Sequence, residues 1–126
     1  MPAAPLPANE PQRLAALQEL GLLDTAPEEG YDALAAAAAQ ACECPIASLS
    51  LIDTSRQWFK AAHGLSLSEL PRENSFCAHA ILGQSLFVVA DTLADERCRD
   101  NPVATAPGGI RFYAGMPLVM PGGEVL

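Results

Sequence analysis

The 126-residue chain has few basic residues, few aromatic residues and no long apolar segment. Seven Lys and Arg against fifteen Asp and Glu give a net charge of −8. A surface of this sign repels phosphate backbones and anionic lipid headgroups, so neither nucleic acid nor direct membrane contact is expected. The longest apolar run, residues 33–39, is far shorter than the roughly 20 residues that span a bilayer.

No secretory signal pattern, a basic segment followed by an apolar core, is present in the sequence. The four cysteines, Cys42, Cys44, Cys77 and Cys98, are therefore expected to be free thiols in a reducing compartment. A half-apolar composition at this length predicts one soluble globular domain, and its expected location is the cytoplasm.

Motifs that would indicate an enzyme or a metal centre are also missing. The sequence contains no P-loop, dinucleotide-binding glycine loop, nucleophile elbow or metalloprotease helix, so no catalytic residue is expected. Cys42 and Cys44 could join His63 and His79 as four zinc ligands. Their spacing lacks the matched pairs of a zinc site, so two buried thiols at a helix end are the favoured interpretation and no metal is expected.

The first half of the chain carries helix signals. Three prolines within residues 1–8 predict a flexible leader, and residues 9–126 are predicted to form the folded domain. Asn9 with Gln12 forms a capping-box-like pattern that opens a helix ended by Gly21. A second capping box, Thr25 with Glu28, opens a helix that is expected to run to about residue 43.

The rest of the chain carries strand and turn signals. Strands are predicted over residues 46–52, 57–62, 86–90 and 110–119, with a short helix capped by Ser75 and a long loop over residues 91–109. Residues 65–72 are predicted to be irregular. Residues 121–124 predict a tight hairpin turn, followed by the first residues of another strand. This order predicts an α+β domain built around an antiparallel sheet.

Four segments in this order resemble the GAF domains of bacterial sensor histidine kinases and cyclic-di-GMP signalling proteins. They are residues 56–60 (RQWFK), 75–81 (SFCAHAI), 91–102 (DTLADERCRDNP) and 110–118 (IRFYAGMPL). The resemblance covers about residues 9–126, and Cys98 stands where the family usually has an aromatic residue. It implies a six-stranded antiparallel sheet with helices on both faces. The last strand of that sheet is expected to be truncated, which would leave unpaired strand edges.

The resemblance implies a sensory or regulatory input domain that binds a small ligand between its sheet and the covering helix and loop. It further implies control of an attached output domain, such as a histidine kinase of a two-component system or a diguanylate cyclase, and a homodimer. No cofactor or ligand identity is indicated. The candidate pocket residues are Trp58, Phe59, Phe76, Cys77, His79, Asp91, Asn101, Arg111 and Phe112.

The roles of several candidates stay open at this point. Trp58 and Phe59 are neighbours on a strand and point to opposite faces, so only one of them can line a pocket. The planar guanidinium of Arg111 could hold Asp91 or an anionic ligand, and the ion pair is favoured. Asn101 is expected to close the long loop as a turn by bonding to its own backbone.

Cys77 opens a short helix, where the helix dipole favours a reactive thiolate if the side chain is exposed. A half-buried structural cysteine is the favoured alternative. Attachment of a bilin is disfavoured because Ala78 separates Cys77 from His79, whereas a bilin-carrying GAF domain has the histidine directly after the cysteine.

Two alternatives to a ligand sensor remain. The first is a ligand-free GAF module for dimerisation, in which Leu14, Leu17 and Leu20 would form a helical dimer interface. The second and weaker one is a thiol redox sensor or enzyme that uses Cys77.

Overall fold

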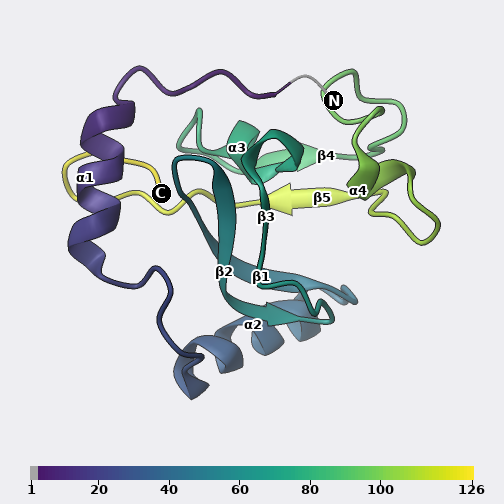
Figure 1. The fold of residues 1–126 in the computed structure, drawn as a ribbon. Helices are drawn as coiled ribbons and strands as arrows, with labels where there is room; N and C mark the ends of the chain where they lie inside the picture. The colour runs from purple at the N-terminus through teal and green to yellow at the C-terminus, as the bar shows by residue number, and fades with distance from the viewer. Residues whose placement is uncertain (1–2) are drawn as a thin grey trace.

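A computed structural model describes residues 3–126, and Met1 and Pro2 of the predicted leader lie outside the described residues. The chain combines helices with antiparallel strands, which confirms the predicted α+β class (Figure 1). The elements are α1 (Glu10–Leu20), α2 (Glu29–Ala41), β1 (Ala47–Ile52), β2 (Arg56–His63), β3 (Glu69–Pro71), the 3-10 helix η1 (Arg72–Asn74), α3 (Cys77–Ala80), β4 (Phe87–Val89), α4 (Pro102–Thr105) and β5 (Tyr113–Gly115).

The two long helices lie where the sequence predicts them, but neither predicted capping box forms. Asn9 precedes α1 without a side-chain cap hydrogen bond, and Gly21 ends the helix with a left-handed φ of 64°. The second helix begins only after Glu28, again without a side-chain cap. Thr25 cannot cap it because its hydroxyl donates to the carbonyl of Leu22 and accepts from the ammonium of Lys60.

The strands form two separate sheets. β1 and β2 make an antiparallel hairpin with an irregularity between Leu49 and Ser50, and β3 pairs with the start of β2. Residues 65–72 are predicted to be irregular, but Glu69–Pro71 form β3 and η1 begins at Arg72. The prediction is therefore wrong for the residues that pair with β2. β4 and β5 pair with each other in a two-stranded sheet.

β5 is much shorter than the predicted strand over residues 110–119. The backbone before it bonds to the preceding loop instead, because Ile110 donates to the carbonyl of Val103, and Thr92 donates to that of Arg111. The predicted hairpin turn over residues 121–124 does form. Val119 and Val125 make an antiparallel bridge across it.

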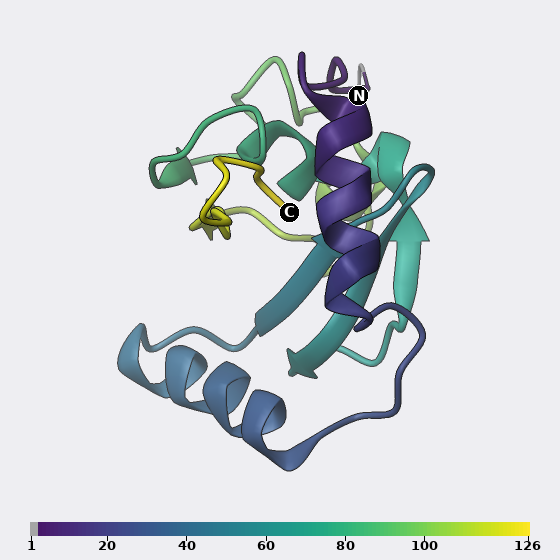
Figure 2. The same cartoon turned by 90° about the vertical axis from the view of Figure 1, so that its left-hand side faces the viewer.

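Helices cover both faces of the first sheet, as expected. Leu51 of β1 and Trp58 of β2 pack against Leu17 of α1 and against Leu126. On the opposite face, Ile52 packs against Ile81, which directly follows α3. In both cartoon views the end of the chain lies beside α1 (Figures 1 and 2). Within residues 3–126, no helix is long and apolar enough to cross a membrane.

The structure corrects the predicted helical dimer interface. Leu17, at the centre of the apolar stripe of α1, is 1% exposed and is part of the domain's own core. Leu14 also packs against that core, and Leu20 is 39% exposed. The stripe therefore attaches α1 to the sheet, and a face that is already buried cannot also bind a second chain.

A third group of buried side chains fills the space between β4, β5 and the long loop. Phe76, Val89, Cys98 and Ala104 pack together there. Cys98, which stands where the related family usually has an aromatic residue, is fully buried and fills part of this core. Loop and sheet are thus joined by apolar contacts.

Candidate ligand-binding site

Five polar side chains gather between the β1–β2 hairpin, α3 and β5, and we call them the polar cluster: Ser50, Gln57, Ser75, Cys77 and Tyr113. Gln57 lies at its centre and is almost fully buried. Its amide nitrogen donates to Ser50 Oγ at 2.9 Å, and its amide oxygen accepts from Ser75 Oγ at 2.6 Å. The Ser75 oxygen in turn accepts from the backbone N–H of Ala78, so this residue does cap the short helix as predicted.

Cys77 connects the two sheets through the polar cluster. Its sulfur lies 3.2 Å from the amide nitrogen of Gln57 on β2 and 2.7 Å from the hydroxyl of Tyr113 on β5. Burial raises the pKa of the Cys77 thiol, although its hydrogen bonds act in the opposite direction. Burial also raises the pKa of Tyr113. Both groups are therefore protonated at neutral pH, which disfavours thiolate chemistry at Cys77.

In the folded domain, the rate at which each cysteine is alkylated should depend on how far it is buried. Because Cys42 is exposed, whereas Cys77 is partly buried and has a thiol pKa raised by desolvation, we expect iodoacetamide at neutral pH to modify Cys42 about 100-fold faster or more. Peptide mass spectrometry over time measures both rates. Unfolding in urea is the control and should bring the two rates together. A Cys77 rate equal to that of Cys42 in the folded state would show that the thiol is accessible and activated.

Aromatic rings line the side of the polar cluster next to β4. The ring centroids of Phe76 and Phe87 lie 5.4 and 5.9 Å from that of Tyr113. His79 stacks nearly parallel to Phe87 at 6.4 Å. The guanidinium of Arg97 lies 4.7 Å from the centroid of Phe87, a cation–π distance. Arg97 thus adds a contact between the long loop and β4.

A local ion pair holds Arg97 in this position. Its guanidinium donates to both carboxylate oxygens of Asp95, at 2.9 and 2.7 Å. These hydrogen bonds lower the pKa of Asp95 to about 2. The charged motif of the loop therefore contributes a contact to the wall of the candidate site.

Asn101 is buried and fixes the end of the loop. Its side-chain oxygen accepts from the backbone N–H of Val103 at 2.9 Å, which is the predicted turn, and its amide nitrogen donates to the carbonyl of Asn74 at 2.8 Å. Arg111 also contacts backbone, since it donates to the carbonyl of Ala104. Among the described residues it forms no ion pair with Asp91, so the favoured ion pair is wrong.

The other predicted pocket residues are divided between the two faces of the sheet. Trp58 packs against α1, while Phe59 pairs with Ser50 of the polar cluster and so lies on the face of the candidate site. Asp91 is exposed and accepts from the backbone N–H of Leu93. Phe112 is exposed next to β5. The structure therefore brings together Phe76, Cys77 and His79. It places Phe59 on the same face of the sheet and uses Asn101 and Arg111 for backbone contacts, whereas Trp58, Asp91 and Phe112 lie outside the site.

Sequence reasoning missed the residues that connect the site. Ser50, Gln57 and Tyr113 were not among the predicted pocket residues, and neither was Arg97. The sequence does contain a signal for Ser50. Ser48 and Ser50 alternate with leucines along β1, which indicates that one face of the strand is polar.

Two open hollows on the surface lie away from the polar cluster. One, of about 330 Å³, lies beside β3 and is lined by Ser55, Arg56, Glu69, Leu70 and Pro71. The other, of about 410 Å³, lies at the start of α2 and is lined by Glu28, Gly30, Tyr31 and Leu34. Neither hollow contains a residue of the candidate site.

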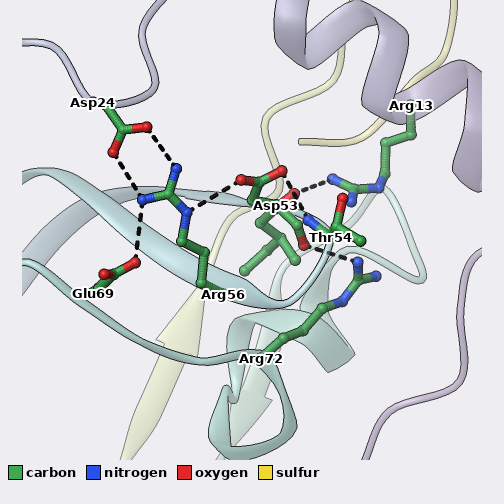
Figure 3. Close-up of polar contacts among 8 residues, drawn as sticks. Arg13, Asp24, Asp53, Thr54, Arg56, Glu69 and Arg72 are labelled. Atoms are coloured by element: carbon green, nitrogen blue, oxygen red, sulfur yellow. Dashed lines mark hydrogen bonds and ion pairs between the residues drawn. The ribbon is translucent and has the colours of Figure 1, made fainter.

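Three arginines surround the β1–β2 turn next to the first hollow (Figure 3). Arg13 of α1 donates to the carbonyl of Ile52 at 2.7 Å, and Arg72 of η1 donates to that of Asp53 at 3.0 Å. Both also bind the carboxylate of Glu10, at 2.9 and 2.7 Å. Through these contacts the first turn of α1 is attached to the turn between the two strands.

Arg56, the third arginine, binds three carboxylates. It contacts both oxygens of Asp24 at 2.8 Å, and one oxygen each of Asp53 and Glu69 at 3.1 Å (Figure 3). These bonds use four of its five N–H donors, which makes it a structural link between the α1–α2 connection and the hairpin. Within residues 3–126, no group of three or more His, Cys, Asp or Glu side chains could hold a metal ion.

The comparisons with known proteins agree with this architecture. Residues 26–126 match the GAF domain family, and the chain belongs to that family. It is also similar to a cyclic di-GMP phosphodiesterase of Pseudomonas aeruginosa, to which it is 46% identical over 118 residues. That alignment covers 94% of this chain and 20% of the relative, so the chain spans about a fifth of the relative's length.

Proposed function

We propose that this GAF domain is the sensory input segment of a bacterial signal-transduction protein. It binds a small ligand between the β1–β2 hairpin and α3, and it controls an attached output domain. The observation that carries the proposal is the polar cluster. Buried polar groups cost free energy unless they are hydrogen-bonded, and ligand sites combine apolar walls with a few converging polar groups of this kind.

The position of the polar cluster supports coupling to the rest of a longer protein. Cys77 and Tyr113 link α3 to β5, and Arg97 links the long loop to β4. A ligand that competes for these hydrogen bonds changes how the loop and the second sheet pack. It shifts the domain between two arrangements only if it binds them with different affinity.

The output is proposed to be turnover of cyclic di-GMP. The similarity to a cyclic di-GMP phosphodiesterase supports this, because the chain matches only about a fifth of that longer enzyme. In the proposed arrangement the domain itself is not catalytic, and the enzymatic part lies elsewhere in the longer protein. A histidine kinase output has less support.

A thermal-shift screen of the 126-residue chain tests ligand binding. A panel of nucleotides, cyclic nucleotides, amino acids and small carboxylic acids should contain at least one compound that raises the Tm, because a ligand at 100 times its Kd stabilises the native state by about 2.7 kcal/mol. Tyr113→Phe should reduce the shift, and Leu34→Ala, an exposed change on α2, should not. A panel without any shift on folded protein would contradict the proposal.

The second candidate function is a ligand-free GAF interaction module. It is favoured by one observation: the space between the sheet and α3 is filled by the chain's own side chains, which satisfy one another's hydrogen bonds. In that case the polar cluster only specifies packing, and the domain transmits signals by holding two chains together. The screen above separates the two candidates.

A further inference from the structure

Two cysteines lie in one tight turn at the end of α2. Cys42 directly follows the helix, and Cys44 is two positions further on. The sequence predicts two buried thiols here, and this prediction is wrong: Cys42 is exposed and Cys44 is half-buried. The helix ends at Ala41, so the cysteines do not continue the face on which Ala35 and Ala39 are buried.

Backbone hydrogen bonds fix the shape of this turn. The N–H of Glu43 donates to the carbonyl of Gln40 at 3.2 Å, and the N–H of Cys44 donates to that of Ala39 at 2.9 Å. These are the two hydrogen bonds of a Schellman motif. Glu43 stands where such a motif usually has glycine, and its φ is 53°. The turn therefore holds a residue in a left-handed conformation that L-residues rarely adopt.

The left-handed residue sets the distance between the two cysteines. From the radius and rise of a helix, the neighbours of a helical residue of either hand have Cα atoms about 5.4 Å apart. Disulfides join cysteines whose Cα atoms lie about 4.4–6.8 Å apart. The Cys44 side chain also points back along the turn, since its thiol donates to the carbonyl of Cys42 at 3.4 Å. A bond between the two sulfurs thus requires rotation of side chains and no movement of α2.

The backbone after the turn is fixed as well. Pro45 follows Cys44, and Gly64 at the end of β2 lies so close to the carbonyl of Pro45 that it leaves no room for a Cβ. The cysteine pair is therefore anchored on both sides, by the end of α2 and by the chain that leads into β1.

We propose that Cys42 and Cys44 form a redox-responsive pair that a peroxide oxidises to an intramolecular disulfide. An accessible cysteine with a second cysteine beside it is the arrangement found in reversible redox sensors. Cys42 is the first to react because it is exposed, and Cys44 resolves the product. The reaction requires only that a peroxide molecule reaches Cys42. It does not require the end of α2 to be a free surface in a longer protein.

The reaction proceeds in two balanced steps. The thiolate of Cys42 attacks one oxygen of hydrogen peroxide, the O–O bond breaks, and Cys42 becomes a sulfenic acid while hydroxide leaves and is protonated to water. The thiolate of Cys44 then attacks the sulfenic sulfur, the S–O bond breaks, and a second hydroxide leaves as water. Together the two thiols lose two protons and two electrons, and the peroxide is reduced to two waters.

The other two cysteines lack these features. Cys77 is hydrogen-bonded to Gln57 and Tyr113 within the polar cluster, and Cys98 is fully buried in a separate core. Redox chemistry is thus assigned to the end of α2, and not to Cys77 as the sequence suggested. Since the pair shares no residue with the polar cluster, this inference does not depend on the proposed ligand binding.

Peroxide treatment of the folded 126-residue chain tests the pair. After hydrogen peroxide and then N-ethylmaleimide, peptide mass spectrometry should find Cys42 and Cys44 joined, with the loss of two hydrogen atoms and no label. Cys77 and Cys98 are internal controls and should take the label once the chain is unfolded in urea. In Cys44→Ser, dimedone should trap a sulfenic acid on Cys42, because the resolving thiol is missing.

Glutathione redox buffers test whether the turn itself favours the disulfide. The equilibrium constant for forming it should be about tenfold or more higher in the folded chain than in concentrated urea, where the Schellman turn is lost. Equal constants in the two states would overturn the inference. So would a chain in which peroxide leaves both thiols reduced, joins Cys42 only to a second chain, or converts it to a sulfinic acid while Cys44 stays reduced.

Discussion

Replacing Glu10 with Gln should lower the free energy of unfolding by about 3 kcal/mol at neutral pH. The carboxylate of Glu10 accepts four hydrogen bonds, two from Arg13 and two from Arg72, at 2.7 to 3.3 Å. Arg13 is fully buried. The substitution removes the one negative charge that both guanidinium groups share and leaves a buried positive charge without compensation, which is the costly way to break an ion pair.

The same carboxylate makes the stability of the domain depend on pH. Hydrogen bonding from Arg13 in the first place, and from Arg72, lowers the pKa of Glu10 from 4.5 to about 2, although its burial opposes this. A group with a lowered pKa in the folded state stabilises that state above its unfolded pKa. This contribution is complete above pH 4.5 and is lost as the pH falls towards about 2. One pKa unit corresponds to about 1.4 kcal/mol, which agrees with the loss expected for Glu10→Gln.

Urea unfolding at about pH 7 and about pH 3 measures both effects. Glu10→Gln should be less stable than the unmodified chain at the higher pH, and the difference should shrink at the lower one. Glu19→Gln, an exposed change on the same helix, is the control and should stay within about 0.5 kcal/mol of the unmodified chain. Equal stability of Glu10→Gln and the unmodified chain at both pH values would show that the Arg13 and Arg72 contacts contribute nothing.

The parts of the fold that depend on local patterns were predictable. The apolar stripe of α1, the alternation along β1 and β2, and the turn residues at 121–124 all correspond to elements of the structure. β3 was not predictable, because Glu69–Pro71 is a strand only through pairing with β2. The capping boxes failed for a related reason: long-range contacts, such as that of Lys60 with Thr25, decide where the side chains bond.

In the candidate site, too, features set by local sequence were predictable and features set by long-range contacts were not. The motif around Cys77 and His79 lies on one short helix, α3, and contributes Cys77 to the polar cluster. Tyr113, which lies 36 positions further on, enters the site only because β5 pairs with β4 next to that helix. Arg97 reaches the site because the long loop folds back over Phe87. Both residues reach the site through contacts between distant segments, which no periodicity in the sequence indicates. For this reason neither was predicted.

The last prediction concerns α1 and decides whether its stripe belongs to the core or to an interface. Leu17→Ala should lower the free energy of unfolding by about 3 kcal/mol, because truncating a fully buried leucine loses apolar contacts and leaves a cavity. Leu17 packs against Leu51, Trp58 and Leu126 of its own chain. The loss should therefore be the same at every protein concentration, whereas an interface residue would give a loss that depends on concentration.

Urea unfolding at two concentrations that differ about 100-fold makes the distinction. Leu20→Ala on the same helix is the matched control. Leu20 is 39% exposed and should cost no more than about 0.5 kcal/mol. If Leu17→Ala left the stability unchanged but converted a dimer to a monomer, α1 would be a dimer helix after all. A lower free energy of unfolding that does not depend on protein concentration would show that Leu17 is a core residue. The apolar face of α1 would then be covered by its own domain and could not also form a dimer interface.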